Sequence, residues 1–179
     1  MKSPEPQYGL PHDSLLQHQA GLRTDYLDIY SRAFTTPCPV CVDSAVKQFF
    51  FSIPRPFLWM LAVREAVARP LGLKTANGKK ATLLEIKRFE GNVGERIALF
   101  EVWNRTEKEI VTGQRDKHLD FILSFYLETR ENQYTLKLFT VIQFNSRLGR
   151  AYFLVVKPIH RLLMPVLVRR LCHRLVHAC

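Results

Sequence analysis

The amino-acid sequence predicts an α+β domain in which a curved antiparallel sheet of about six strands wraps around a long C-terminal helix. Three observations lead to this prediction: strand-like alternation with good turn residues recurs between residues 23 and 145, helical segments follow the first strand, and the last third of the chain has helical periodicity. Sequential strands joined by short loops form an antiparallel sheet, and such a sheet needs an apolar element over one face.

The composition is that of one globular domain, with 179 residues of which 47% are hydrophobic and 23% charged. We expect residues 1–21 to form an N-terminal arm and residues 22–179 to form the domain. The formal net charge of +10 favours anionic partners but carries no information on fold. Neither a signal sequence nor an uninterrupted apolar span is visible, so we expect a cytoplasmic location.

The first strand is predicted at residues 23–34, where apolar and polar residues alternate. A short helix at 45–51 can be capped by Asp43 or Ser44, and a second helix at 56–68 lies between proline-containing breaks. Five further strands are expected, at 83–89, 96–104, 108–113, 117–128 and 134–145.

The closing helix has apolar residues at mostly three- and four-residue steps, and we expect this stripe to face the sheet. The stripe consists of Leu148, Tyr152, Val155, Ile159, Leu162, Val166 and Leu167. Pro158 and Pro165 each remove an internal hydrogen bond, so we expect a short helix at 147–155 followed by a longer, bent one.

A pocket between the sheet and the closing helix is the predicted binding site for an apolar or amphipathic small molecule, lipids included. The residues expected to line it are Trp59, Val63, Leu119, Phe121, Leu123, Phe125, Phe139, Tyr152, Val155, Ile159 and Leu162. A small-molecule binding module is therefore the favoured function. A peripheral membrane or lipid-handling protein is an alternative, because the C-terminal helix is basic.

His118 and Asp120 are the candidate catalytic residues, since they lie two apart on one strand face and a carboxylate can orient an imidazole for acid–base chemistry. The apolar row takes the opposite face, so a structural interpretation competes, in which the pair bonds to neighbouring loops. No catalytic signature motif is present in the sequence, and a non-enzyme is favoured.

A second polar group surrounds the start of the closing helix and comprises Asn145, Arg150, Lys157, His160 and Arg161. Its cations either hold an anionic head group or anchor the helix to nearby loops. Farther along, Arg169, Arg170 and Arg174 are interpreted as solvated charge or as contacts to an anionic membrane surface. Nucleic acid is not an expected partner, because no basic face interleaved with aromatic residues is evident.

Cys38 and Cys41 form a CxxC pair, which can be a redox pair, half of a zinc site or two ordinary thiols. No βαβ pattern follows the pair. The other cysteines and histidines near the C-terminus do not have the spacing of a familiar zinc module. We therefore expect reduced thiols, no metal and no cofactor.

Four segments, Pro70–Lys74, His118–Phe121, Leu148–Tyr152 and Lys157–Arg161, resemble a bacterial family of unknown function whose members look like START/Bet v1-type (SRPBCC) domains. The resemblance covers roughly residues 22–172. It implies the helix-grip fold and an apolar-ligand cavity, but no established activity. Family members occur alone or fused behind NAD(P)-binding Rossmann domains, which implies an alternative function as a reductase-associated domain using His118 and Asp120. This chain has no GxGxxG after a strand.

Overall fold

The computed structural model describes residues 10–18, 23–53 and 83–177. One antiparallel sheet has the strand order β1-β6-β5-β4-β3-β2. Its strands are β1 (Tyr26–Thr35), β2 (Arg96–Ile97), β3 (Phe100–Arg105), β4 (Glu109–Gln114), β5 (Leu119–Arg130) and β6 (Gln133–Phe144). The described helices are α1 (Leu15–His18), α2 (Val42–Phe51), α4 (Leu83–Arg88) and α5 (Arg147–Val176).

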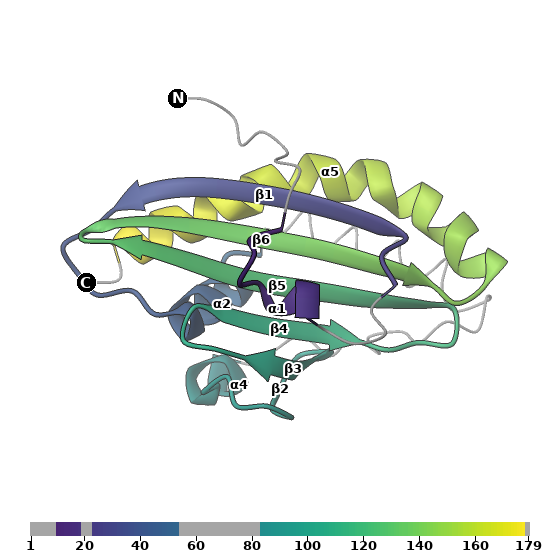
Figure 1. The fold of residues 1–179 in the computed structure, drawn as a ribbon, viewed down its shortest axis with the longest axis horizontal. Coiled ribbons are helices and arrows are strands. Elements are labelled where there is room, and N and C mark those ends of the chain that lie inside the picture. Colours follow the sequence, from purple (N-terminus) through teal and green to yellow (C-terminus); the bar gives the residue numbers. More distant parts are fainter. Residues whose placement is uncertain (1–9, 19–22, 54–82, 178–179) are drawn as a thin grey trace.

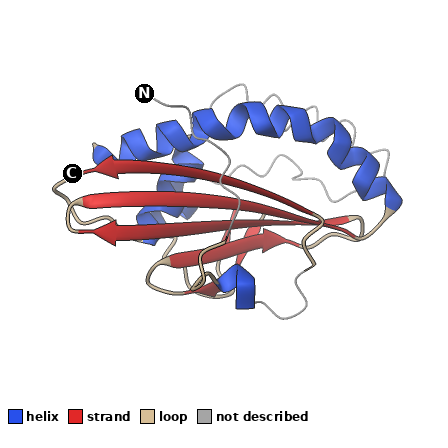
Figure 2. Ribbon diagram, turned by 45° about the horizontal axis from the view of Figure 1, so that its top comes forward, coloured by secondary structure: helices blue, strands red, loops and turns tan. Residues whose placement is uncertain are grey.

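Helices α2 and α5 cover one face of the sheet, and α1 lies on the other (Figure 1). The first strand pairs with the last, Tyr26 lying opposite Ile142, so β1 forms the edge beneath α5. Figure 2 shows the long strands curving beneath this helix. The predicted α+β architecture, a helix-grip-like sheet of six strands with a long C-terminal helix, is confirmed.

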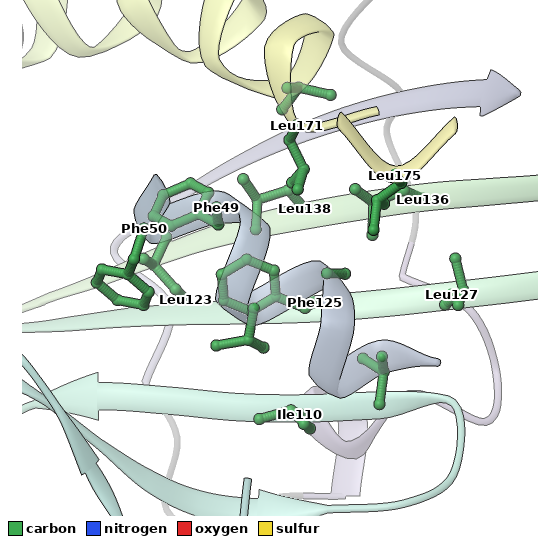
Figure 3. Close-up of a cluster of buried hydrophobic side chains, with 14 of the residues drawn as sticks. Phe49, Phe50, Ile110, Leu123, Phe125, Leu127, Leu136, Leu138, Leu171 and Leu175 are labelled. Carbon is green, nitrogen blue, oxygen red and sulfur yellow. The ribbon is translucent and has the colours of Figure 1, made fainter. Parts of the chain in front are cut away.

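The main core lies between the sheet and the two large helices. Leu123, Phe125 and Leu127 of β5 point to this face, as their alternation predicts, and all are buried. Figure 3 shows them facing side chains from α2 and α5, including Phe49 and Leu171. Burying an aliphatic or aromatic side chain of this size contributes about 1.5–3 kcal/mol, so this layer is the main source of stability.

Two of the predicted strands are wrong. Residues 83–88 form the helix α4, in which Ile86 is buried and the side chains around it are exposed. Phe89, three residues after Ile86, is also buried, and this spacing is helical. The run at 96–104 is split into β2 and β3, because Ala98 adopts a positive φ of 55° in the turn between them. The predicted helix at 56–68, which contains Trp59 and Val63, lies outside the described residues.

Helix α5 is continuous over 30 residues, so the predicted break between 155 and 158 is wrong. It begins at Ser146, whose Oγ accepts a hydrogen bond from the Gly149 N–H at 3.1 Å. Pro158 and Pro165 lie inside the helix, which curves along the sheet (Figure 2). Proline is tolerated here within a helix that the sheet and α2 hold in place along its length.

The side of α5 that packs on the sheet matches the expected stripe only in part, through Tyr152 and Leu167. Its buried residues are Gly149, Tyr152, Phe153, His160, Met164, Leu167, Val168, Leu171, Cys172 and Leu175. Val155, Leu162 and Val166 were expected in the buried stripe, but their exposed fractions are 57%, 75% and 45%. Ile159 is half-buried. Apolar residues occupy both sides of this helix, so their spacing alone did not identify the side that packs on the sheet.

Residues 10–18 lie against the opposite face of the sheet, where Leu16 joins a second apolar cluster with Ile29, Ile122 and Phe139. Phe139 was expected to line a pocket beneath α5. The structure corrects this, because Phe139 alternates with Leu138 along β6 and so points to the α1 face.

Candidate functional site

His118 and Asp120 hold the corner between β5, β6 and the start of α5. The His118 Nδ1 atom lies 2.9 Å from Ser146 Oγ, and the His118 carbonyl accepts hydrogen bonds from the backbone N–H groups of Asn145 and Ser146. Asp120 accepts from the Asn145 side-chain amide at 3.0 Å and from the Asp116 N–H at 2.9 Å. These contacts are the ones that the structural interpretation of the pair predicts. The catalytic interpretation stays a prediction.

The second predicted polar group does not come together as one site. Asn145 belongs to the corner just described, and the Arg150 guanidinium lies over the Phe144 ring at 5.5 Å. The other three members, Lys157, His160 and Arg161, all reach the first half of β1. They meet a set of residues there that sequence reasoning missed.

This set is a buried polar network around Asp28, which is 6% exposed. Tyr26 and Tyr30 both donate their hydroxyl protons to Asp28 Oδ2, the latter at 3.4 Å. His160 Nδ1 lies 3.7 Å from the same oxygen, and Arg161 lies 3.9 Å from the other. The carboxylate therefore sits among two hydroxyls and two basic groups between β1 and α5.

Burial alone would raise the pKa of the Asp28 carboxyl, but its contacts with His160 and Tyr26 hold that pKa below its ordinary value. A buried carboxylate that keeps its charge must have such partners, so the network anchors α5 to the sheet. The sequence does contain a signal for it. Tyr26, Asp28 and Tyr30 are spaced two apart and share one face of the first strand.

A cavity of about 820 Å³ lies farther along this face, between β1, the end of α2 and the C-terminal half of α5. The sheet contributes Arg32 and Phe34, and the end of α2 contributes Phe51 and Ile53. Helix α5 supplies Val166, Arg169, Arg170, Cys172, His173, Arg174, Val176 and His177. The volume falls within the range of about 300–1,000 Å³ that is typical of small-ligand sites.

The cavity wall is strongly basic. Among the described residues, four arginines line it, namely Arg32, Arg169, Arg170 and Arg174, and no carboxylate does. Within residues 10–18, 23–53 and 83–177, none of these arginines lies within ion-pair distance of a carboxylate. Unpaired guanidinium groups gathered around one hollow create a positive potential that attracts an anion.

Residues 22–167 match the sequence pattern of DUF2867, a family described as protein of unknown function. The chain belongs to DUF2867. No curated protein and no solved structure matches it. The wider relationship to SRPBCC domains and the fusion to Rossmann domains remain implications of the resemblance.

The DUF2867 match includes β1 and the Asp28 network but ends before Arg169. The cavity is thus built partly from the matched region, through Arg32 and Phe34, and partly from the C-terminal turns of α5 beyond it. Of the ligand-lining residues predicted from the sequence, five lie on the α5 face of the sheet or in its packing against α5, but none of them lines this cavity. These five are Leu119, Phe121, Leu123, Phe125 and Tyr152.

Cys38 and Cys41 of this DUF2867 chain do not form a disulfide with each other, because Cys41 is free whereas Cys38 is disulfide-bonded. The expectation of a reduced thiol is therefore wrong for Cys38. Cys172 is free and lines the cavity, but burial raises its pKa to about 12, so the thiol stays protonated and is a poor nucleophile. Among the described residues, no three His, Cys, Asp or Glu side chains gather as a metal site.

Proposed function

We propose that this protein is a binding module for an amphipathic small molecule with an anionic group, held in the cavity between β1, α2 and α5. The observation that carries the proposal is a set of four arginines around a cavity of about 820 Å³, namely Arg32, Arg169, Arg170 and Arg174, none of which forms an ion pair with another described residue. The sequence predicts either an apolar or an amphipathic ligand, and these arginines favour the amphipathic one.

The chemistry of the wall supports both halves of such a ligand. A guanidinium group presents its donors in a planar fork that matches the oxygens of a carboxylate or phosphate. Phe34, Phe51, Ile53 and Val166 offer apolar surface beside the arginines, on which a hydrocarbon portion can lie. A purely inorganic anion would use only the basic half of this wall.

Titration calorimetry with three probes of equal chain length tests the proposal: decyl phosphate, decanoate and decanol, each below its micelle concentration. We expect the two anions to bind and decanol to bind at least about tenfold more weakly, because only the anions engage the arginines. Arg170→Gln should weaken binding of decyl phosphate by about 30-fold, the equivalent of about 2 kcal/mol for one hydrogen-bonded charge contact.

Arg147→Gln is the matched control, because Arg147 is an exposed arginine of α5 that does not line the cavity. This variant should bind all three probes as the unmodified chain does. Equal affinity for decanol and decyl phosphate, or an equal loss of affinity in both variants, would contradict a binding site built on the cavity arginines.

A further inference from the structure

Helix α5 carries a second apolar surface, on the side that faces away from the sheet. Leu154, Val155, Leu162 and Val166 have exposed fractions of 67%, 57%, 75% and 45%, and we call these four residues the outer band. They share one side of the helix because positions four, seven and eight residues apart align in an α-helix. A cluster of exposed leucine and valine side chains on one helix is typical of an interaction surface.

The charged residues that α5 contributes at either end of the outer band all have one sign. Arg147 and Arg150 are exposed in the first turn, and Arg169, Arg170 and Arg174 are exposed after the band ends. Helix α5 contains no Asp or Glu, and none follows Glu131 in the sequence. An apolar strip with arginines at both ends complements an anionic lipid surface, in which acyl chains lie beneath a layer of phosphate groups.

The packing of α5 on the sheet limits how this helix can bind a bilayer. By length and composition α5 could cross a membrane, since its most apolar window has a mean hydropathy of 1.5. However, 33% of that window is buried inside the protein, and Met164, Leu167 and Leu171 belong to the main core. A spanning helix would have to leave the sheet. A helix lying flat on the surface keeps this core intact and uses only its outer side.

We propose that the outer side of α5 docks on the surface of an anionic bilayer, with the outer band in the acyl boundary and the flanking arginines among the lipid phosphates. The residues of α5 that pack in the core lie on the opposite side of the helix, so docking on a bilayer would leave the contacts between α5 and the sheet intact. Val166, Arg169 and Arg170 belong both to this side and to the cavity wall, so docking would bring the cavity next to the lipid. The proposal does not depend on the cavity holding a ligand.

Vesicle co-sedimentation of the full chain tests the proposal. The vesicles contain either phosphatidylcholine alone or phosphatidylcholine mixed with phosphatidylglycerol. We expect binding to the anionic vesicles at low salt and a loss of binding at high salt, because the arginine contribution is screened. The double variant L154D/L162D should bind anionic vesicles roughly tenfold or more weakly, since it places carboxylates where lipid chains would lie.

The matched control is the double variant L84D/V93D. Leu84 and Val93 are also exposed apolar residues, at 56% and 62%, but they lie in α4 and in a turn. This variant carries the same added charge and should bind vesicles as the unmodified chain does. The variant R147Q/R150Q tests the charges separately without touching the cavity wall, and should bind about tenfold or more weakly. Circular dichroism shows whether each variant is folded.

Three outcomes would overturn the proposal: equal binding to neutral and anionic vesicles, equal losses in L154D/L162D and L84D/V93D, or no binding to either vesicle. Sedimentation velocity identifies the competing occupant. A dimer of the unmodified chain that L154D/L162D converts to monomer would show that a second copy covers the outer band. The calorimetric result with decyl phosphate is independent of the vesicle result, because the residues changed in the vesicle variants do not line the cavity. These residues are Arg147, Arg150, Leu154 and Leu162.

Discussion

At the scale of single residues, Gly149 shows why one position in the first turn of α5 cannot carry a side chain. A Cβ atom at this position would lie 2.0 Å from the carbonyl oxygen of His118 and 2.7 Å from its carbonyl carbon. That carbonyl cannot move aside freely, because it accepts the backbone hydrogen bonds of Asn145 and Ser146. The corner therefore requires glycine for its close approach of two backbones.

Gly149→Ala is expected to destabilise the protein. Helix propensity alone would favour alanine by about 1 kcal/mol, whereas a forced backbone shift costs about 1–3 kcal/mol and occasionally more. We expect a net loss of up to about 2 kcal/mol in the free energy of unfolding, measured by urea denaturation. Ala151→Gly in the same helix is the comparison and should cost only about 1 kcal/mol, since Ala151 is exposed. A more stable Gly149→Ala protein would contradict the crowded corner.

The Leu148–Tyr152 segment is one of the four segments that carry the resemblance, but its role could not be predicted from the sequence. Glycine is required at position 149 because the backbone there lies close to the carbonyl group of His118, which is distant in the chain. The Asp28 network was missed for a similar cause. A lone acidic residue in a predicted strand looks solvent-facing until its partners, His160 and Arg161, are brought to it by α5.

At the scale of elements, alternation predicted β1, β4, β5 and β6 well because each has one side in an apolar layer. Short segments were harder. A six-residue run such as 83–88 fits either period, and its packing on α2 decides the outcome. The inward side of helix α5 was predicted only in part, since Tyr152 and Leu167 of the expected stripe are buried whereas Val155, Leu162 and Val166 are exposed. Apolar residues on the two sides of this helix have equivalent spacing, and only the sheet distinguishes them.

Two alanine substitutions in α5 measure which side carries the packing. Leu171 is fully buried in the main core, whereas Leu162 is 75% exposed. Leu171→Ala should lower the free energy of unfolding by about 2–5 kcal/mol, since it leaves a cavity in the packed layer. Leu162→Ala should change it by no more than about 0.5 kcal/mol. Thermal or urea denaturation of the two variants provides the comparison, and similar losses would contradict the observed orientation of α5.

At the scale of the whole molecule, a buried carboxylate joins the N-terminal segment to the sheet on the side opposite α5. Glu109 of β4 is 1% exposed and accepts hydrogen bonds from Ser14 Oγ at 2.9 Å and from the Leu15 N–H at 2.6 Å. Ser124 of β5 donates to the same carboxylate. Residues 10–18 are thereby held over the second apolar cluster, which gives both sides of the sheet a cover.

This carboxylate should make stability depend on pH. Burial raises the pKa of Glu109 above its ordinary value of 4.5, although the bonds from Ser124, Leu15 and Ser14 oppose the shift. The folded state therefore holds the proton more tightly than the unfolded chain does. The stabilising contribution is complete below pH 4.5 and is lost as the pH rises through the raised pKa.

Glu109→Gln removes this titration, so the pH dependence of the free energy of unfolding just above pH 4.5 should become flatter in the variant. Hydrogen exchange should also become faster at residues 15–17, because an amide offers the Leu15 N–H a weaker acceptor than a carboxylate does. Urea denaturation across this pH range and exchange mass spectrometry measure the two effects. Glu107→Gln, at an exposed position of the preceding turn, should alter neither, and an unchanged pH profile in Glu109→Gln would contradict the assignment to Glu109.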